Sequence, residues 1–183
     1  EIPVPQPVRR VYILKPGKTE RRPLGIPVMQ DRAAQALVKQ ALEPEWEARF
    51  EPDSYGFRPG RGCHDAIQYI FEQIMHQPKY VLDADIAKCF DRIDHNALLD
   101  KMGAAPRVRR MVRGWLKAGV MEGDIFERTE QGSPQGGVIS PLLANIALHG
   151  LENEIMRQST RTRRVAGMDL VWTPRVIRYA DDF

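Results

Sequence analysis

Two short apolar runs that end in carboxylates constrain the fold of this chain more than any other feature of its sequence. The first is YVLDADI (80–86), in which two aspartates, the second of them Asp85, alternate with apolar residues and so face one side of a strand. The second is RVIRY (175–179), followed one residue later by the acid pair Asp181 and Asp182. Adjacent strand residues point to opposite faces, and like charges repel each other. The fold must therefore compensate several negative charges at the ends of two extended segments.

The residues alone leave two interpretations of these acids open. Asp85 could be a strand-end acid on a wet face, with Asp181 and Asp182 in an ordinary turn, because Asp is common in turns. Alternatively, a hard divalent cation, which accepts oxygen ligands from several carboxylates, compensates them. Because both runs deliver carboxylates, the pattern favours the metal site. Two Mg²⁺ ions about 3.5–4 Å apart would suit phosphoryl transfer.

Composition and charge narrow the classes of protein further. The sequence has no apolar stretch of about 18 residues and no signal peptide, so we expect no membrane partner. Cys63 and Cys89 lack a zinc or disulfide spacing and fit a reducing, cytoplasmic location. The net charge is only +3, but the basic residues cluster at 9–22, 107–117 and 157–164, which favours a polyanionic partner over plain solvated helix faces.

The hydrophobic periodicity predicts an α+β chain, because helices and strands follow one another in mixed order. Asp31 is expected to cap a helix that Pro44 kinks or restarts. The other predicted elements are a hairpin at 10–28, a helix at 64–77, a strand at 80–86, a helical pair at 95–118, a hairpin at 120–130, a long helix at 140–158, and strands at 168–172 and 175–179.

Several motifs, in order and spacing, resemble those of reverse transcriptases. YVLDADIAKCFDRIDH, QGSPQGGVISPLLANI and RYADDF are similar to the palm motifs, and the segment from PGKTERRPLG to GCHDAI is similar to the fingers. The closest resemblance is to bacterial group II intron reverse transcriptases (maturases). It extends from about Val11 to Phe183. Any one motif is modest, but several in the right order are specific.

The resemblance implies a right-hand polymerase architecture, with an antiparallel palm sheet packed on helices. Residues 1–9 would be an extended lead-in, 10–78 the fingers and 79–183 the palm, partly interleaved with the fingers. We also expect the palm to be incomplete and the chain to end before a thumb. Residues 1–183 alone would then polymerise weakly or not at all.

The family's catalytic acids correspond to Asp85, Asp181 and Asp182 in this sequence. By resemblance, Asp85 and Asp181 would bind both of two Mg²⁺ ions, for which Mn²⁺ can substitute. Asp182 would be a supporting ligand, and the backbone carbonyl of Ile86 would complete one coordination shell. A tight hairpin turn would lift the adjacent acids out of strand alternation and present them beside Asp85.

Other positions correspond to contacts with nucleotide and nucleic acid. Phe90 would block a 2′-hydroxyl and select deoxynucleotides, although the residue itself is equally compatible with a core position. Gln135 and Gly136 would lie at the incoming nucleotide. Lys18 and Arg22, ahead of Lys15 and Arg21, are the candidates for the triphosphate. Arg58 and Arg61 would contact template phosphates, with the alternative that Arg58 fixes its own loop through carbonyls.

The implied activity is RNA-directed DNA synthesis from a DNA primer and dNTPs, together with a splicing role on group II intron RNA. Three alternatives stay open. One is a splicing maturase without significant polymerase activity, and another is a retron, diversity-generating or CRISPR-linked reverse transcriptase. The third is a metal-dependent nuclease, which would need neither Phe90 nor a triphosphate-binding loop.

Overall fold

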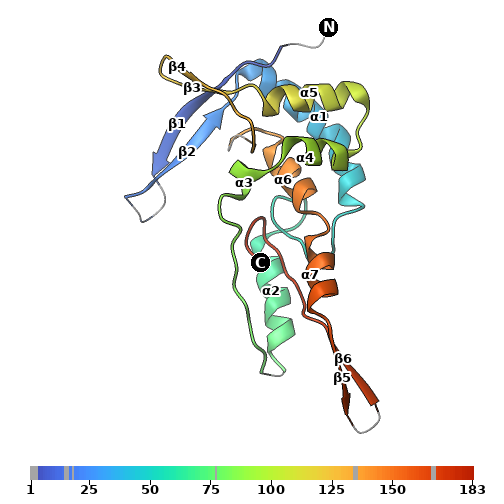
Figure 1. Ribbon diagram of the computed structural model, residues 1–183. Coiled ribbons are helices and arrows are strands. Elements are labelled where there is room, and N and C mark those ends of the chain that lie inside the picture. Colours follow the sequence, from blue (N-terminus) through green and yellow to red (C-terminus); the bar gives the residue numbers. More distant parts are fainter. Residues whose placement is uncertain (1–3, 15–16, 18, 77, 134–135, 166–167) are drawn as a thin grey trace. The chain divides into compact units, whose positions relative to one another are not determined.

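The computed structural model of the chain describes residues 4–14, 17, 19–76, 78–133, 136–165 and 168–183 (Figure 1). The chain folds into two units. Unit 1 comprises residues 1–48 and 87–147, and unit 2 comprises residues 49–86 and 148–183. The predicted division into fingers and palm concerns functional parts rather than these units, and it stays a prediction.

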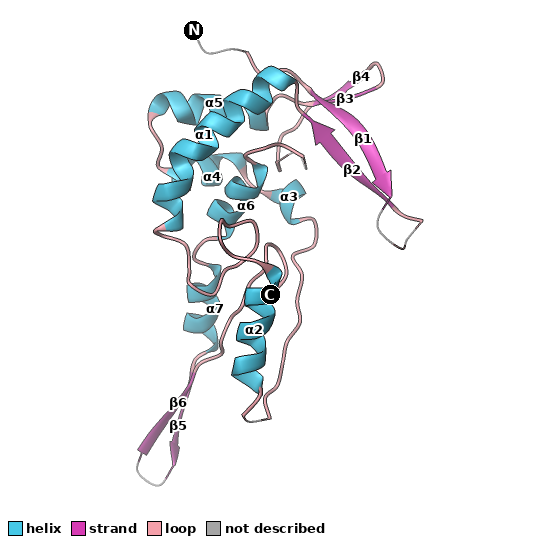
Figure 2. Ribbon diagram, turned by 180° about the vertical axis from the view of Figure 1, so that it is seen from behind, coloured by secondary structure: helices cyan, strands magenta, loops and turns pink. Residues whose placement is uncertain are grey.

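A four-stranded mixed sheet belongs to unit 1 (Figure 2). The strands β1 (Val8–Leu14) and β2 (Arg21–Ile26) pair antiparallel, and so do β3 (Val120–Glu122) and β4 (Ile125–Glu127). Strand β1 also pairs parallel with β3, which gives the order β2-β1-β3-β4. Both hairpins predicted from turn residues and alternation are confirmed.

Aliphatic side chains fill the interior of unit 1. Leu99, Val112 and Ile146 are each 0% exposed, and they come from three different helices. Such burial stabilises a fold by roughly 25 cal/mol per Å² of apolar surface. The helices of the described part of unit 1 are α1 (Met29–Glu47), α3 (Cys89–Arg92), α4 (His95–Met102), α5 (Pro106–Leu116) and α6 (Ser140–Leu148), whose last residue begins unit 2.

Helix α1 differs from its prediction in two details. Its N-cap is Val28, so Asp31 lies in the first helical turn instead of capping it, and it is only 4% exposed. The helix also runs through Pro44 without ending there. A proline removes one backbone donor from a helix, and Pro44 lies in the last turn of α1, which ends at Glu47.

Unit 2 contains the helices α2 (Cys63–Ile74) and α7 (Leu151–Ser159) and the antiparallel hairpin of β5 (Arg161–Val165) with β6 (Met168–Trp172). The predicted single helix at 140–158 is wrong, because α6 ends at Leu148 and α7 begins at Leu151. The reason is Gly150, whose φ of 93° lies in the left-handed region that glycine readily adopts and that ends a helix.

The two runs that carry the carboxylates do not form the regular strands that alternation predicted. Residues 78–84 and 173–177 have no strand structure, and backbone pairing is confined to a few positions near the acids. In the described residues the runs lack continuous neighbouring strands, and a strand needs such partners for its backbone groups. The α+β class is nevertheless confirmed.

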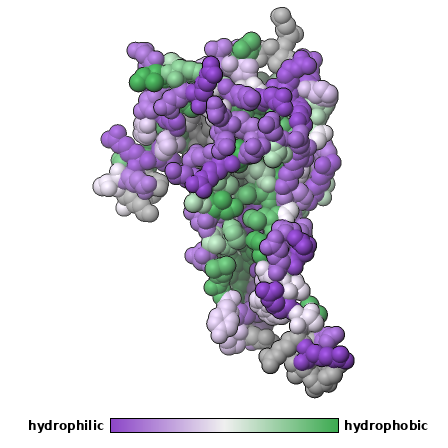
Figure 3. All heavy atoms as spheres, in the orientation of Figure 1, coloured by the Kyte–Doolittle hydropathy of each residue, from purple (hydrophilic) through white to green (hydrophobic). Residues whose placement is uncertain are grey.

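An apolar surface lies on unit 2. On α2 the side chains of Ile67, Phe71 and Ile74 are 61%, 55% and 42% exposed, and Val81 and Leu82 in the extended run are 71% and 82% exposed. Apolar side chains gather on this side of the unit in the space-filling view (Figure 3). None of the described helices is both long and apolar enough to cross a membrane.

Candidate active site

The candidate site is built on a short backbone ladder in unit 2. Ala84 and Phe183 exchange two hydrogen bonds, with N···O distances of 2.8 and 2.9 Å, and the Ile86 N–H donates to the carbonyl of Asp181 at 3.1 Å. Asp85 and Asp182 are thereby an antiparallel bridge pair. The structure thus brings together Asp85, Ile86, Asp181 and Asp182, four residues that sequence reasoning assigned to one site.

Residues 179–182 form a tight turn, which we call the carboxylate turn. Tyr179 and Asp182 are bonded to each other through both backbone N–H groups, at 2.8 and 3.1 Å. Between them Ala180 has φ of 61°, a left-handed conformation that is uncommon for a residue with a side chain. The turn takes the two acids out of strand alternation, as the resemblance implied.

Electrostatic repulsion is concentrated on this turn. Partial desolvation, followed by the negative charges of Asp181, Asp85 and Asp83, raises the pKa of Asp182 above its ordinary value. Asp85 and Asp182 are exposed, and Asp181 is half-buried. A cation at this position would relieve the repulsion, since oppositely charged neighbours favour the ionised carboxylate.

The donor set fits a hard divalent cation, although the side chains do not already enclose one. Among the described residues, no three acidic, histidine or cysteine side chains lie close enough together to form a ready metal site. Carboxylates and backbone carbonyls are nevertheless the ligands that Mg²⁺ and Mn²⁺ prefer. The backbone ladder positions the chain, while the exposed side chains of Asp85 and Asp182 are free to rotate toward an ion.

Two arginines of unit 2, Arg58 and Arg61, were expected to contact template phosphates, and the structure places Arg58 otherwise. Arg58 is only 6% exposed and donates from Nη1 to the carbonyls of Glu51 and Ser54, both at 2.8 Å. The structure therefore favours the alternative role, in which Arg58 fixes its own loop, over a phosphate contact. Arg61 is half-buried, donates to the carbonyl of Pro52 and lies 5.6 Å from the ring centre of Tyr55.

Behind the carboxylate turn lies a group of buried ionisable residues that sequence reasoning missed. Arg178 is 0% exposed, and its Nε lies 4.0 Å from Oε1 of Glu152, which is itself 3% exposed. Burial and the charge of Glu51 raise the pKa of Glu152 to about 7, against the opposing effect of Arg178. One signal in the sequence could have indicated it. Arg178 directly follows two apolar residues, 176 and 177, in a run that was predicted to be a strand.

Glu51 belongs to the same group. Its carboxylate accepts hydrogen bonds from His149 Nδ1 at 2.8 Å and from the backbone N–H of Gly150. Burial alone would raise the pKa of Glu51, but hydrogen bonds from its own backbone N–H, from His149 and from Gly150 lower it. Glu51 therefore also anchors the break between α6 and α7.

In unit 1 the predicted nucleotide-binding loop, QGSPQGG (131–137), is hydrogen-bonded to the segment that carries Phe90. The N–H of Ser133 donates to the carbonyl of Phe90 at 2.7 Å, and the N–H of Gly132 donates to the carbonyl of Ile93 at 2.9 Å. Buried His95, another residue that sequence reasoning missed, donates from Nε2 to the carbonyl of Gly132 at 2.6 Å. Hydrogen bonds therefore join the segment of half-buried Phe90 to the described residues Gly132 and Ser133 of this loop.

Other predicted nucleotide contacts also lie in unit 1. A side chain at Gly136 would meet the carbonyl of Gly25 at 2.9 Å, so the loop runs closely against β2, the strand that carries exposed Arg22. Lys18 and Gln135, as well as Lys15, fall outside the described residues.

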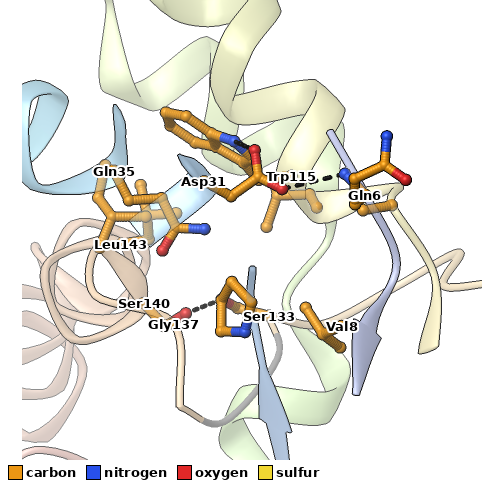
Figure 4. Close-up of a pocket in the computed structure, with 13 residues that line it drawn as sticks. Gln6, Val8, Asp31, Gln35, Trp115, Ser133, Gly137, Ser140 and Leu143 are labelled. Atoms are coloured by element: carbon orange, nitrogen blue, oxygen red, sulfur yellow. Dashed lines mark hydrogen bonds between the residues drawn. The ribbon is translucent and has the colours of Figure 1, made fainter. Parts of the chain in front are cut away.

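Helix α1 supports the far end of the same loop (Figure 4). Gln35 accepts a hydrogen bond from the N–H of Val138 at 2.9 Å. Buried Asp31 accepts one from Trp115 Nε1 at 3.2 Å, drawn as a dashed line in Figure 4. Gln35, Asp31 and Trp115 line a cavity of about 10 Å³. One water needs roughly 10–15 Å³, so the cavity is a packing feature and not a substrate site.

Comparison with known proteins decides the family. The sequence profile of the family described as "Reverse transcriptase (RNA-dependent DNA polymerase)" matches residues 13–183, which include both carboxylate runs. The chain belongs to the reverse transcriptase family. The resemblance noted from the motifs is thereby confirmed.

Individual reverse transcriptase relatives agree with this assignment. The chain is 40% identical over 156 residues to "Group II intron-encoded protein LtrA" of Lactococcus lactis subsp. cremoris, covering 84% of this chain and 26% of that protein. It is 36% identical over 209 residues to "Protein YkfC" of Escherichia coli strain K12, covering 98% of this chain and 54% of that protein. The chain thus spans about a quarter and about half of these two relatives.

A solved structure supports the fold. The apo telomerase of Candida tropicalis, truncated from its C-terminal domain, aligns with a TM-score of 0.52 at 14% sequence identity, over 91% of this chain and 43% of that one. At this identity the likeness concerns the fold of a reverse transcriptase and not its substrates.

Proposed function

We propose that this chain is the fingers and palm part of a group II intron reverse transcriptase, which extends a DNA primer on an RNA template. The observation that carries the proposal is the ladder joining residues 84–86 to 181–183. The ladder pairs Asp85 of the first carboxylate run with Asp182 of the second, and this pairing supports a shared site for nucleotidyl transfer.

The chain's own residues have separate tasks in the proposed reaction. Asp85 and Asp181 would hold two Mg²⁺ ions, or Mn²⁺ in their place, with Asp182 and the Ile86 carbonyl as further ligands. When bound, the ions supply charge neutralisation at the α-phosphate and activation of the primer 3′-hydroxyl. Catalysis by the protein is then mainly positioning, because it fixes the ions relative to primer and nucleotide.

Binding of the nucleotide falls to residues of unit 1. Phe90 would stand against the sugar and exclude a 2′-hydroxyl, with Gln135 and Gly136 beside the nucleotide. Lys18 and Arg22 would neutralise the triphosphate, since Lys and Arg bind phosphate through charge-assisted hydrogen bonds. Exposed Arg22 on β2 is compatible with this role. On the side of the nucleic acid, we keep Arg61 as the candidate for a template phosphate.

A second function, binding of group II intron RNA in splicing, is favoured by the names of several relatives. They include LtrA, a group II intron-encoded protein, and "Nuclear intron maturase 1, mitochondrial" of Arabidopsis thaliana, 29% identical over 86 residues. Binding through the RNA backbone would weaken steeply with salt. We place both activities in the cytoplasm, in agreement with the cysteine content.

Primer extension on poly(rA)/oligo(dT) tests the polymerase, with the protein at its full natural length. We expect Mg²⁺-dependent incorporation of dTTP that falls roughly thousand-fold in Asp181→Asn, because a ligand at the developing charge is lost. Asp169→Asn, an exposed acid on β6, is the matched control and keeps the wild-type rate. Absence of incorporation in the wild type, or full activity of Asp181→Asn, overturns the proposal. Strand cleavage without dNTPs would indicate the nuclease instead.

A further inference from the structure

The interior of unit 2 contains a charge that the proposed reaction does not use. Arg178 is completely buried, three positions before Asp181. Its Nη1 donates to the carbonyl of Ala180 at 2.9 Å, and its Nη2 donates to Oγ of Ser54 at 2.7 Å. These guanidinium donors therefore reach the backbone of the carboxylate turn and its support, not a carboxylate of the site.

Burial of a guanidinium needs a compensating benefit. Removing an ion from water costs several kcal/mol, and well-packed apolar residues often stabilise an interior as well or better. The counter-charge here is Glu152, at 4.0 Å from Nε. That distance is longer than a charge-assisted hydrogen bond of about 2.7–2.9 Å, so the ion pair alone does not explain the arginine.

The carbonyl that accepts from Arg178 belongs to Ala180, the residue of the turn with the unfavourable backbone conformation. Ala180 has φ of 61°, and a non-glycine residue in the left-handed region costs on the order of 1–3 kcal/mol. Its carbonyl belongs to the peptide unit that leads into Asp181. Fixing this carbonyl therefore fixes the peptide plane from which the Asp181 side chain departs.

The backbone of residues 53–56, which we call the supporting segment, also holds the carboxylate turn in place. The N–H of Arg178 donates to the carbonyl of Asp53 at 3.0 Å, and the N–H of Tyr55 donates to the carbonyl of Arg178 at 2.8 Å. A Cβ on Gly56 would lie 2.3 Å from the nitrogen of Ala180. The supporting segment thus contacts the turn directly, and Ser54 adds its hydroxyl to the guanidinium.

We propose that Arg178, oriented by Ser54, is a positioning residue that holds the Ala180 carbonyl and thereby aims the carboxylate of Asp181 toward Asp85. The inference rests on the proposed function, because it assigns a task within the same metal-binding site. It also gives the supporting segment a role distinct from binding of template. Groups that orient metal ligands typically change metal affinity or activity by 10–100-fold when they are removed.

The test compares Ser54→Ala and Arg178→Lys with the wild type and with Arg175→Lys. Arg175 is the matched control, because it lies on the same segment, is exposed and pairs with Asp53 at 3.4 Å. Binding of Mn²⁺ without substrate is measured by electron paramagnetic resonance, and primer extension is measured against Mg²⁺ and dNTP concentration. Thermal unfolding gives the folded fraction of each variant.

We expect Ser54→Ala and Arg178→Lys to weaken Mn²⁺ binding roughly ten-fold, with a matching rise in the Mg²⁺ midpoint. The KM for dNTP should stay unchanged, because the nucleotide contacts belong to unit 1. Arg175→Lys should behave as the wild type. The lysine of Arg178→Lys is smaller than the guanidinium that it replaces, and this variant could fail to fold. In that case Ser54→Ala, which removes a single hydroxyl, decides the question.

Two outcomes overturn the inference. One is wild-type Mn²⁺ binding in folded Ser54→Ala, and the other is a loss of activity that only follows the folded fraction. Failure of the proposed function looks different, because then the wild type itself shows no Mg²⁺-dependent extension. Mn²⁺ binding separates the two cases without any appeal to activity.

Discussion

The interiors of the two units are built from different side chains. In unit 1 the fully buried positions include Leu99, Val112 and Ile146, which are aliphatic. In unit 2 the bulkiest fully buried side chain is Arg178, accompanied by Glu152 at 3% exposure. Aliphatic packing is non-directional, whereas hydrogen bonds fix angles as well as distances. The unit that carries the carboxylates is thus the one whose interior is held by directional contacts.

This difference suggests a division of tasks between stability and geometry. A hydrocarbon core tolerates substitution as long as volume and pattern are kept. A buried polar network loses more when one member is removed, because the partners are left unsatisfied. Substitutions in the two interiors should therefore fail in different ways, and the expected effects below run from the largest to the smallest.

The largest effect is expected from Leu99→Ala in unit 1. It should lower the free energy of unfolding by about 2–5 kcal/mol, because it removes buried methyl groups and leaves a cavity. Urea unfolding measures the loss, and hydrogen exchange should place it in the amides of unit 1. Leu37→Ala, at a position 70% exposed on α1, is the control and should change little. Equal loss of protection in both units would remove the distinction between them.

Arg178→Met should cost about 3 kcal/mol, because Glu152 and the groups bonded to the guanidinium lose their partner. The double variant Arg178→Met/Glu152→Leu should recover part of this loss, since two apolar residues replace the buried pair. Urea unfolding of the single and double variants forms a double-mutant cycle. If the single variant is as stable as the wild type, the interior of unit 2 does not depend on its charge.

Gly56→Ala should destabilise unit 2 by about 1–3 kcal/mol through overpacking. The added methyl would meet backbone atoms of Ala180, which cannot rotate away as a flexible side chain could. Gly62→Ala is the matched control, because its methyl would lie 3.6 Å from a carboxylate oxygen of Asp65, an ordinary contact. Thermal unfolding compares the two, and equal stability would show that the turn shifts easily against the supporting segment.

The last effect concerns pH, and it is the smallest for a change of one pH unit. Burial and the charge of Glu51 raise the pKa of Glu152 from 4.5 to about 7, so the folded chain keeps a proton that the unfolded chain releases. This contribution to stability is complete below pH 4.5 and is lost as pH rises toward 7. The wild type should therefore lose stability relative to Glu152→Gln over this range, by at most about 1.4 kcal/mol per pH unit.

Glu154→Gln on the same helix is the control for this pH dependence. The hydrogen bond from Arg157 lowers the pKa of Glu154 from 4.5 to about 2, so its contribution is lost only as pH falls below 4.5. Urea unfolding at several pH values should thus show a difference in stability between this variant and the wild type that stays constant from pH 4.5 to 7. A flat difference for Glu152→Gln as well would contradict the raised pKa.

Sequence patterns predicted the elements whose determinants are local. The hairpins of β1–β2 and β3–β4 and the helices α4 and α5 follow from turn residues and apolar periodicity, and the structure contains them. The break at Gly150 was missed because the apolar stripe continues across it. The extended runs at 80–86 and 175–179 were predicted as strands because alternation reports which side a residue faces, whereas a strand also needs neighbours for its backbone.

The candidate site shows the same limit. The acids were recognisable because Asp85, Asp181 and Asp182 lie in motifs of fixed spacing, and their adjacency then followed from the ladder. The residues that hold the turn could not be recognised by spacing. Ser54 and Arg178 are 124 positions apart and meet only in three dimensions. From sequence alone, an arginine such as Arg178 is predicted to be exposed. The pattern of neighbouring residues does not reveal which distant segments bury it.

The pairing of Ala84 with Phe183 also sets an order of events during synthesis. The Asp85 segment leaves the ribosome well before the carboxylate turn, by about 5–20 s at roughly 5–20 residues per second. Its partner, residues 181–183, does not yet exist during that interval, and closing so long a loop carries an entropic cost that grows with loop length. The nascent chain therefore holds an incomplete acid cluster until the carboxylate turn emerges, and the acids of the two segments cannot act together before that moment.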